Sequence, residues 1–226
     1  MPLQKAVALS PLRSLSPPKH LRIAEALVGY KGFSCYQFVQ EVMKYSYPHA
    51  WDDMLLLREE MKTKTPKSYW SDDFIPYTYT QVDLSKAYYW RRLGLQDATE
   101  GDLLVYLDQH YDPDPASRDK KCPSGGTHVG IIQKILQRTE KQYSFVLLDA
   151  SQRGKGRHIK SPDNIPPYTL NQRLSGVVAY SPVTITKEGD SIEAPLYEFG
   201  FCGYVYPNKH VHVIRYIPDE TAWIKE

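Results

Sequence analysis

Residues 32–43 read Gly-Phe-Ser-Cys-Tyr-Gln-Phe-Val-Gln-Glu-Val-Met and combine a helix start with a cysteine. Ser34 is followed three residues later by Gln37, which is the pattern of a capping box. Apolar residues then repeat at helical spacing, so the segment predicts an amphipathic helix. Cys35 falls in its first turn, where the helix dipole and the backbone N–H groups favour a negative charge. A thiolate in such a position is a candidate nucleophile.

A candidate base for this thiol begins a later apolar segment. His128 lies in Thr-His-Val-Gly-Ile-Ile at 127–132 and follows Gly125 and Gly126. A segment that is apolar on both faces is typical of a buried central strand, and two glycines leave room for a substrate backbone. A histidine taken alone is more often structural, so this interpretation depends on a partner for the imidazole.

The next apolar segment offers that partner. Asp149 ends Phe-Val-Leu-Leu-Asp at 145–149, and the polar residues between the two segments predict a hairpin. A two-residue turn at 138–139 pairs His128 directly with Asp149, whereas a four-residue turn at 138–141 makes Asp149 its diagonal neighbour on the same face. A turn of odd length places the two side chains on opposite faces. With an even turn, the carboxylate can orient the imidazole as in a catalytic triad.

The order of the predicted elements indicates the fold class. Helical patterns precede residue 101, and the apolar period changes to two after it. Helices followed by strands predict an α+β fold in which N-terminal helices pack on an antiparallel sheet. We expect a flexible arm at 1–18, which holds four prolines, and a single domain at 19–226 with a helical insertion at about 51–98.

Finer boundaries follow from the same patterns. Within the insertion, a second helical pattern covers about 84–93. Strands are predicted at 103–107, 128–137, 142–150, 176–180 and 211–217, with a weaker strand signal near 197–206.

The composition excludes several classes of protein. The chain has 226 residues, is 42% hydrophobic and balances 28 Lys+Arg against 26 Asp+Glu. It shows no basic stripe, so we expect no nucleic-acid partner. No apolar run approaches the roughly 20 residues that span a membrane, and we see no signal peptide. We therefore expect a soluble protein without a membrane span, and the compartment stays open between the cytoplasm and non-classical export.

The other cysteines and histidines carry weaker signals. Cys35, Cys122 and Cys202 are too few and too widely spaced for a disulfide framework or a zinc site. Cys122 is interpreted as a loop thiol, with a redox-regulatory role as the alternative, and Cys202 as a small buried hydrophobe. His210 and His212 share a strand face but have no third ligand close in sequence. We interpret them as solvent-facing and expect no metal and no cofactor.

Together these segments resemble the NlpC-type and CHAP-type families of papain-like cysteine peptidases and amidases. Those families place a catalytic Cys at a helix start, continue with Pro-Gly-Asp-Leu at a strand start and then a His-Val-Gly/Ala-Ile strand. Here the matching segments hold Cys35, Thr-Glu-Gly-Asp-Leu-Leu at 99–104, His128 and Asp149. The resemblance implies a papain-like fold with a partly barrel-like sheet and a Cys35–His128–Asp149 centre. It also implies an oxyanion or substrate role for Tyr30, because the family often has a tyrosine upstream of the nucleophile.

The chain departs from the family pattern in three places. Ser-Cys-Tyr-Gln at 34–37 replaces the common Asp-Cys-Ser-Gly, and Glu100 stands where Pro is common. Asp149 occupies the third position, which is often His in the NlpC type and Asn or Glu in the CHAP type. These differences leave the cysteine chemistry intact and the substrate open.

The function that the resemblance implies is a thiol hydrolase that acts through an acyl-enzyme. Its substrate would be an amide or peptide bond in peptidoglycan or a related isopeptide. An alternative keeps the same centre and makes the protein a secreted effector or toxin that deamidates or acylates a host protein. A second alternative is a catalytically inactive binding module on the same fold.

Overall fold

The computed structural model describes residues 17–64, 87–108, 127–151, 159, 176–188, 196–201 and 204–217. Helices come first and strands afterwards, so the predicted α+β class is confirmed. The elements are α1 (Lys19–Ala26), α2 (Cys35–Ser46), α3 (Pro48–Lys64), β1 (Trp90–Leu93), the 3-10 turn η3 (Leu95–Asp97), β2 (Leu103–Asp108), β3 (Thr127–Arg138), β4 (Gln142–Asp149), β5 (Ala179–Glu188), β6 (Leu196–Phe201) and β7 (Tyr204–Tyr216). Within these ranges no helix is both long and apolar enough to cross a bilayer.

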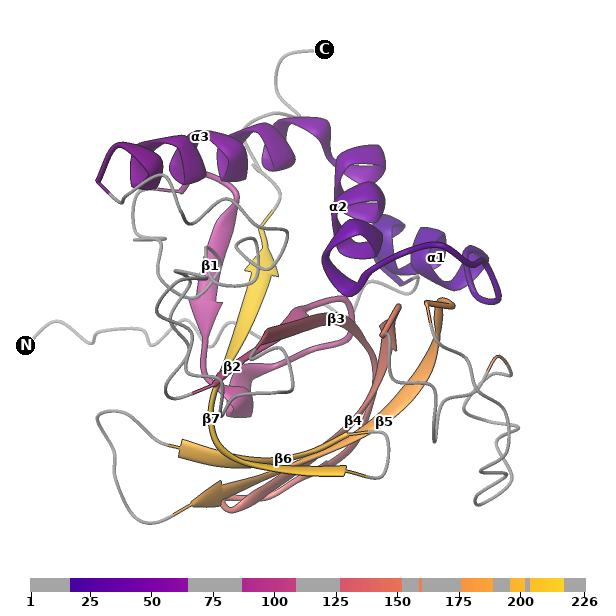
Figure 1. Cartoon of the computed structure of the whole chain (residues 1–226), viewed down its shortest axis with the longest axis vertical. Coiled ribbons are helices and arrows are strands. Elements are labelled where there is room, and N and C mark those ends of the chain that lie inside the picture. Colours follow the sequence, from indigo (N-terminus) through magenta and orange to yellow (C-terminus); the bar gives the residue numbers. More distant parts are fainter. Residues whose placement is uncertain are drawn as a thin grey trace, which may run out of the picture.

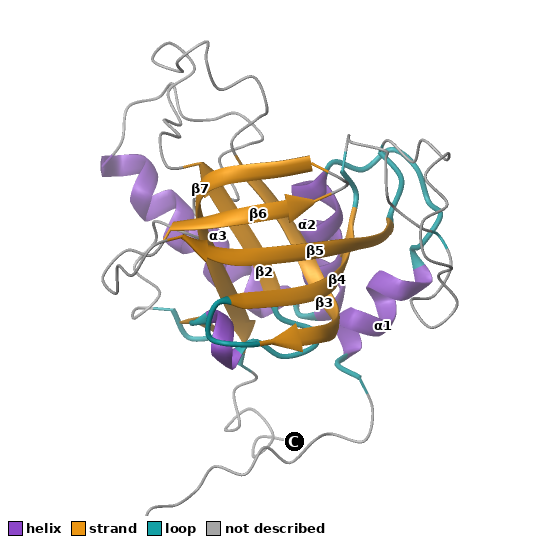
Figure 2. Cartoon of the chain, turned by 90° about the horizontal axis from the view of Figure 1, so that it is seen from below, coloured by secondary structure: helices purple, strands orange, loops and turns teal. Residues whose placement is uncertain are grey.

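The strands form one antiparallel sheet that curls on itself (Figure 1). Their order is β1-β7-β2-β3-β4-β5-β6, and β6 also pairs with β7. This second pairing is possible because β7 is long: its first residues pair with β6, and residues 209–214 pair with β2. The six strands from β2 to β7 therefore close a ring (Figure 2). β1 extends the sheet beside β7 (Figure 1). The predicted antiparallel, barrel-like sheet is thus present.

Alternation along the strands divides the apolar residues between two cores. The outer core lies between the sheet and the helices, where α2 packs on β3 and β4 (Figure 1). The buried face of α2 includes Phe38, Val39, Val42 and Met43, as its helical spacing predicts. The inner core fills the ring with the residues of opposite parity, such as Leu104, Ile132, Leu147 and Val183.

The start of α2 is fixed by its own cap and by the sheet. Ser34 is the N-cap, and the predicted capping box is confirmed: the Ser34 hydroxyl accepts from the Gln37 N–H, and the Gln37 side chain accepts from the Ser34 N–H. The preceding loop is hydrogen-bonded to the segment before β5, through Gly29 N to Val178 O at 2.8 Å and Gly32 N to Gly176 O at 3.0 Å. These bonds hold the first turn of α2 against the sheet.

Two predicted boundaries were wrong. The helix expected over about 84–93 is not present at 90–93, where β1 pairs with β7. The Trp90 indole is fully buried and donates to Ala50 O at 2.7 Å, so tertiary packing overrides the helical pattern. The strand expected at 176–180 instead begins at Ala179 and continues through Pro182 to Glu188. Pro182 is tolerated because β6 pairs with β5 only from Val183 onward, so this part of β5 is an edge.

Candidate active site

The predicted neighbours His128 and Asp149 are brought together at one end of the β3–β4 hairpin. His128 Nε2 lies 2.6 Å from Asp149 Oδ2. The turn occupies residues 139–142, and β3 contains two bulges that each shift the register by one residue. Each shift moves the side chains of β3 to the opposite face relative to their partners on β4. Two shifts therefore cancel, and the side chains of His128 and Asp149 both lie on the inner face of the ring. His128 and Asp149 are therefore diagonal neighbours, as expected for a four-residue turn, although the turn lies one residue later in the chain than expected.

Gly130 makes this diagonal contact possible. It lies between His128 and Ile132 on the inner face of β3, next to the end of β4. A Cβ at this position would lie 3.1 Å from Leu148 O and 3.3 Å from Asp149 Cβ. The missing side chain leaves the space through which the carboxylate reaches the imidazole.

The Asp149 carboxylate is fully buried and accepts hydrogen bonds on both oxygens. Oδ2 accepts from His128, and Oδ1 accepts from the Ser181 hydroxyl at 2.6 Å. Hydrogen bonds donated to a carboxylate favour its charged form. A buried carboxylate stays charged only where hydrogen bonds and an opposite charge compensate for its lost hydration.

The Cys35 thiol meets the imidazole from the start of α2. It lies within hydrogen-bonding reach of the His128 side chain, and its charge acts on that ring. Because Nε2 is bonded to Asp149, Nδ1 is the nitrogen left for the thiol. Two aromatic rings of the inner face hold the imidazole in place: Tyr106, at 5.6 Å between centroids, and Phe201, at 4.8 Å.

These contacts set the protonation state of His128, which is only 5% exposed. Burial by itself lowers the pKa of a histidine, because the imidazolium loses hydration. The negative charge of Cys35, the hydrogen bonds to Asp149 and Cys35, and the charge of Asp149 outweigh burial and raise the pKa of His128 to about 9. The ring is therefore a cation near neutral pH, and a thiol beside a cationic imidazole is the setting in which cysteines act as nucleophiles.

This arrangement can carry out nucleophilic chemistry. A thiolate at a helix start can attack a carbonyl carbon while the imidazolium supplies a proton to the leaving group. The first N–H groups of a helix have no acceptor within the helix, so α2 can also stabilise an oxyanion that forms beside Cys35.

Tyr30, the predicted oxyanion or substrate residue, lies at the surface. Its side chain is 61% exposed in the turn after α1. Its backbone carbonyl accepts from Val178 N at 2.9 Å. Among the residues described, no hydrogen bond joins the Tyr30 phenol to Cys35 or His128, so its oxyanion role stays a prediction.

The structure describes some of the weaker candidate residues and not others. Cys122 and Cys202 lie outside the described residues. His210 and His212 are half-buried rather than solvent-facing, and burial, Arg92 and His210 together lower the pKa of His212 to about 4. In the described ranges no three His, Cys, Asp or Glu side chains are grouped to hold a metal ion.

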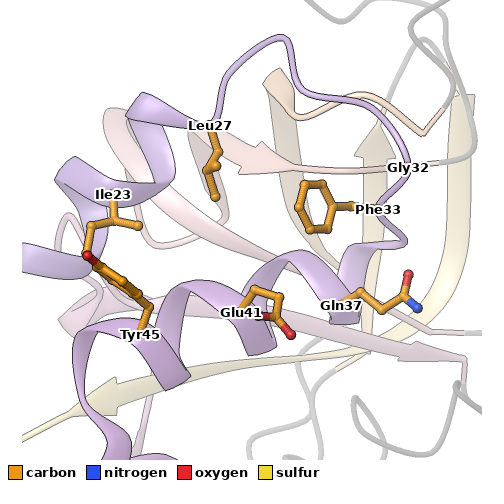
Figure 3. A pocket seen from close by; sticks show the side chains of 7 residues that line it. All are labelled: Ile23, Leu27, Gly32, Phe33, Gln37, Glu41 and Tyr45. Carbon is orange, nitrogen blue, oxygen red and sulfur yellow. The ribbon is translucent and has the colours of Figure 1, made fainter.

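A groove of about 600 Å³ runs between α1 and α2 (Figure 3). Leu27 lines it from the α1 side, and Gln37 and Tyr45 line it from α2. Phe33 lies in the loop that leads into α2. Phe33 and Gln37 flank Cys35 in the chain, but neither Cys35 nor His128 is among the residues that line the groove.

Sequence reasoning missed Ser181, Gly130 and Phe201 as parts of this site. Ser181 belongs to an alternating series, Ala179-Ser181-Val183-Ile185, that marks the inner face of β5. That period was available in the sequence, but Pro182 concealed it by suggesting a strand end. Phe201 has no comparable signal, because only closure of the ring brings β6 opposite His128.

Comparison with family models, curated proteins and solved structures produced no match for this chain. Functional conclusions therefore depend on the residues of the centre and on their geometry.

Proposed function

We propose that this protein is a papain-like cysteine hydrolase that cleaves an amide or peptide bond. The observation that supports this most strongly is one buried imidazole that contacts a thiol at a helix start and a fully buried carboxylate. A structural histidine has no need of two anionic neighbours, whereas a base that serves a thiol nucleophile does.

The reaction begins with the Cys35 proton on His128 Nδ1. The Cys35 sulfur attacks the substrate carbonyl carbon, and the oxyanion is stabilised by N–H groups of the first turn of α2. The C–N bond then breaks as the imidazolium gives its proton to the leaving amine, which leaves a thioester on Cys35. Water loses a proton to His128 and attacks the thioester, the C–S bond breaks, and a carboxylic acid is released. Asp149 holds the imidazole in the tautomer that this cycle requires.

The substrate class follows from resemblance to the NlpC-type and CHAP-type families. The order of a helix-start cysteine, a strand histidine and an acid on the next strand supports membership, as does the antiparallel ring. We therefore expect a peptide bond of peptidoglycan or a related isopeptide. The apolar groove beside α2 provides a surface for the substrate chain.

A digest analysed by mass spectrometry tests this function. Purified peptidoglycan, a set of peptides and isopeptides, and candidate host proteins are incubated with wild type, with Cys35→Ala and with Cys122→Ala as a thiol control. We expect cleavage products and a trapped thioester with wild type and Cys122→Ala, and neither with Cys35→Ala. Full hydrolysis by Cys35→Ala would exclude this assignment. Deamidated or acylated proteins without cleavage would instead assign the centre to the effector class.

A further inference from the structure

We infer that Ser181 is a positioning residue of the same centre, whose hydroxyl orients the Asp149 carboxylate so that its other oxygen stays on His128. This inference rests on the proposed function, since a fixed carboxylate matters chemically only where His128 serves Cys35. Ser181 acts through Asp149 in this account and not on the substrate.

The sheet brings the three side chains into a row. Asp149 pairs with Ala179 and Leu147 pairs with Ser181, so Ser181 is the diagonal neighbour of Asp149 on the inner face. Its hydroxyl donates to Asp149 Oδ1 at 2.6 Å, the same length as the bond from His128 to Oδ2. The row therefore crosses three adjacent strands, from β3 through β4 to β5.

The burial of Ser181 makes its hydrogen bond energetically important. Ser181 is fully buried, and the next inner-face residues of β5 are the apolar Val183 and Ile185. A hydroxyl in such a place is unfavourable unless it is hydrogen-bonded. A bond from a hydroxyl to a carboxylate is stronger than one between neutral groups. The position is thus suited to hold an anion and poorly suited to a plain packing role.

The carboxylate needs a second contact because one bond does not fix its plane. The terminal torsion of an Asp side chain is broad and roughly two-fold. A single bond from His128 to Oδ2 allows the group to rotate about that contact, and Gly130 leaves space on that side. A donor on Oδ1 removes this freedom, so the imidazole is held at one angle toward Cys35.

The test uses two measurements that need no substrate. In a Cys122→Ala, Cys202→Ala background, the rate of Cys35 alkylation by iodoacetamide is measured near pH 6.5, and the titration of His128 is followed by NMR. We expect Ser181→Ala to lower the pKa of His128 by about one unit and to slow alkylation, because an imidazolium held at another angle stabilises a thiolate on Cys35 less. Ser181→Cys keeps the packing but is a weak donor, and it should give the same loss. Ser181→Thr keeps the hydroxyl and should retain most of the wild-type rate.

Ser46→Ala is the matched control. The Ser46 hydroxyl is also buried and donates to Val42 O at 2.6 Å, but it lies at the far end of α2. We expect this variant to leave both measurements unchanged.

A wild-type alkylation rate and an unchanged His128 titration in Ser181→Ala would overturn the inference, and so would an equal loss in Ser46→Ala. If wild type alkylates no faster than His128→Gln, the proposed function fails, and the His128 titration alone then decides the role of Ser181.

Discussion

His20 in α1 and His128 in β3 are two histidines buried to nearly the same extent, 4% and 5% exposed. Each has an Nε2 that makes a 2.6 Å hydrogen bond, His20 to Gly101 O and His128 to Asp149 Oδ2. Their pKa values nevertheless move in opposite directions. Burial lowers the pKa of His20, and its bond to Gly101 and the charge of Asp102 only partly offset this.

The charge of the neighbours explains the difference. His20 meets a neutral carbonyl and the Tyr47 hydroxyl at 3.3 Å. The nearby Asp102 is already bonded by both Nε and Nη2 of Arg215, at 2.9 and 2.8 Å. His128 instead faces a thiol and the Asp149 carboxylate. Burial with a short hydrogen bond thus accompanies a lowered pKa in His20 and a raised pKa in His128.

Asp149→Ala should have the largest effect on the difference between the two histidines. It removes the carboxylate that orients the imidazole, so we expect hydrolysis to fall about 1,000- to 10,000-fold. Steady-state kinetics on the best substrate of the digest measures the loss. Asp102→Asn is the control, because it changes a buried carboxylate beside the other histidine and should affect stability without a comparable loss of activity. Equal activity losses in the two variants would contradict this account.

Gly130→Ala perturbs the same contact more gently. The added Cβ meets Leu148 O and Asp149 Cβ and should displace the carboxylate by a few tenths of an ångström. We expect about a tenfold lower rate of hydrolysis and of Cys35 alkylation. Gly200→Ala is matched, since its Cβ would lie 3.3 Å from Thr184 O on the outer face of β6. Similar effects of the two substitutions would contradict a specific role for the space at Gly130.

His20→Leu tests the structural member of the pair. It leaves Gly101 O without its buried donor, so the free energy of unfolding should fall by about 1–3 kcal/mol. Urea denaturation measures this change. The alkylation rate of Cys35 should remain that of wild type, because His20 contacts Tyr47 at the end of α2, whereas Cys35 begins that helix. A slowed alkylation with intact folding would show that the two regions are coupled.

The two histidines should also give opposite pH dependences of stability. The folded-state pKa of His128 is above the ordinary value of 6.5, so its stabilisation is full below that pH and is lost as pH rises through about 9. The pKa of His20 is depressed, so its region loses stability as pH falls below 6.5. Unfolding curves of wild type, His128→Gln and His20→Leu across this range test both signs. Parallel curves for the two variants would contradict the assignment.

Local patterns predicted much of the fold and of the site. The capping box places Cys35 at a helix start through contacts within four residues, so the sequence carries all the information needed. The sequence limited the β3–β4 hairpin to two cases: an even turn, which places His128 and Asp149 on one face, and an odd turn, which places them on opposite faces. The two bulges were not predictable, because they depend on packing along the whole of β3.

The contacts that local patterns could not predict arise from closure of the ring between distant parts of the chain. Ring formation by β6 and β7 brings Phe201 to His128 from 73 residues further along the chain, and no local pattern encodes that contact. β1 was mistaken for a helix because its strand character arises from pairing with β7, more than 100 residues away. Ser181 lies between these cases, since its alternation was visible but Pro182 suggested a strand end.

The titration of His128 by NMR, in wild type and in Cys35→Ala, tests the central claim most directly. That claim is an imidazolium held between the Cys35 thiolate and the Asp149 carboxylate. We predict a pKa of about 9 in wild type and a clearly lower pKa when the thiol is removed, because Cys35 contributes both charge and a hydrogen bond. A His128 that titrates near its ordinary value of 6.5 in both proteins would contradict the account.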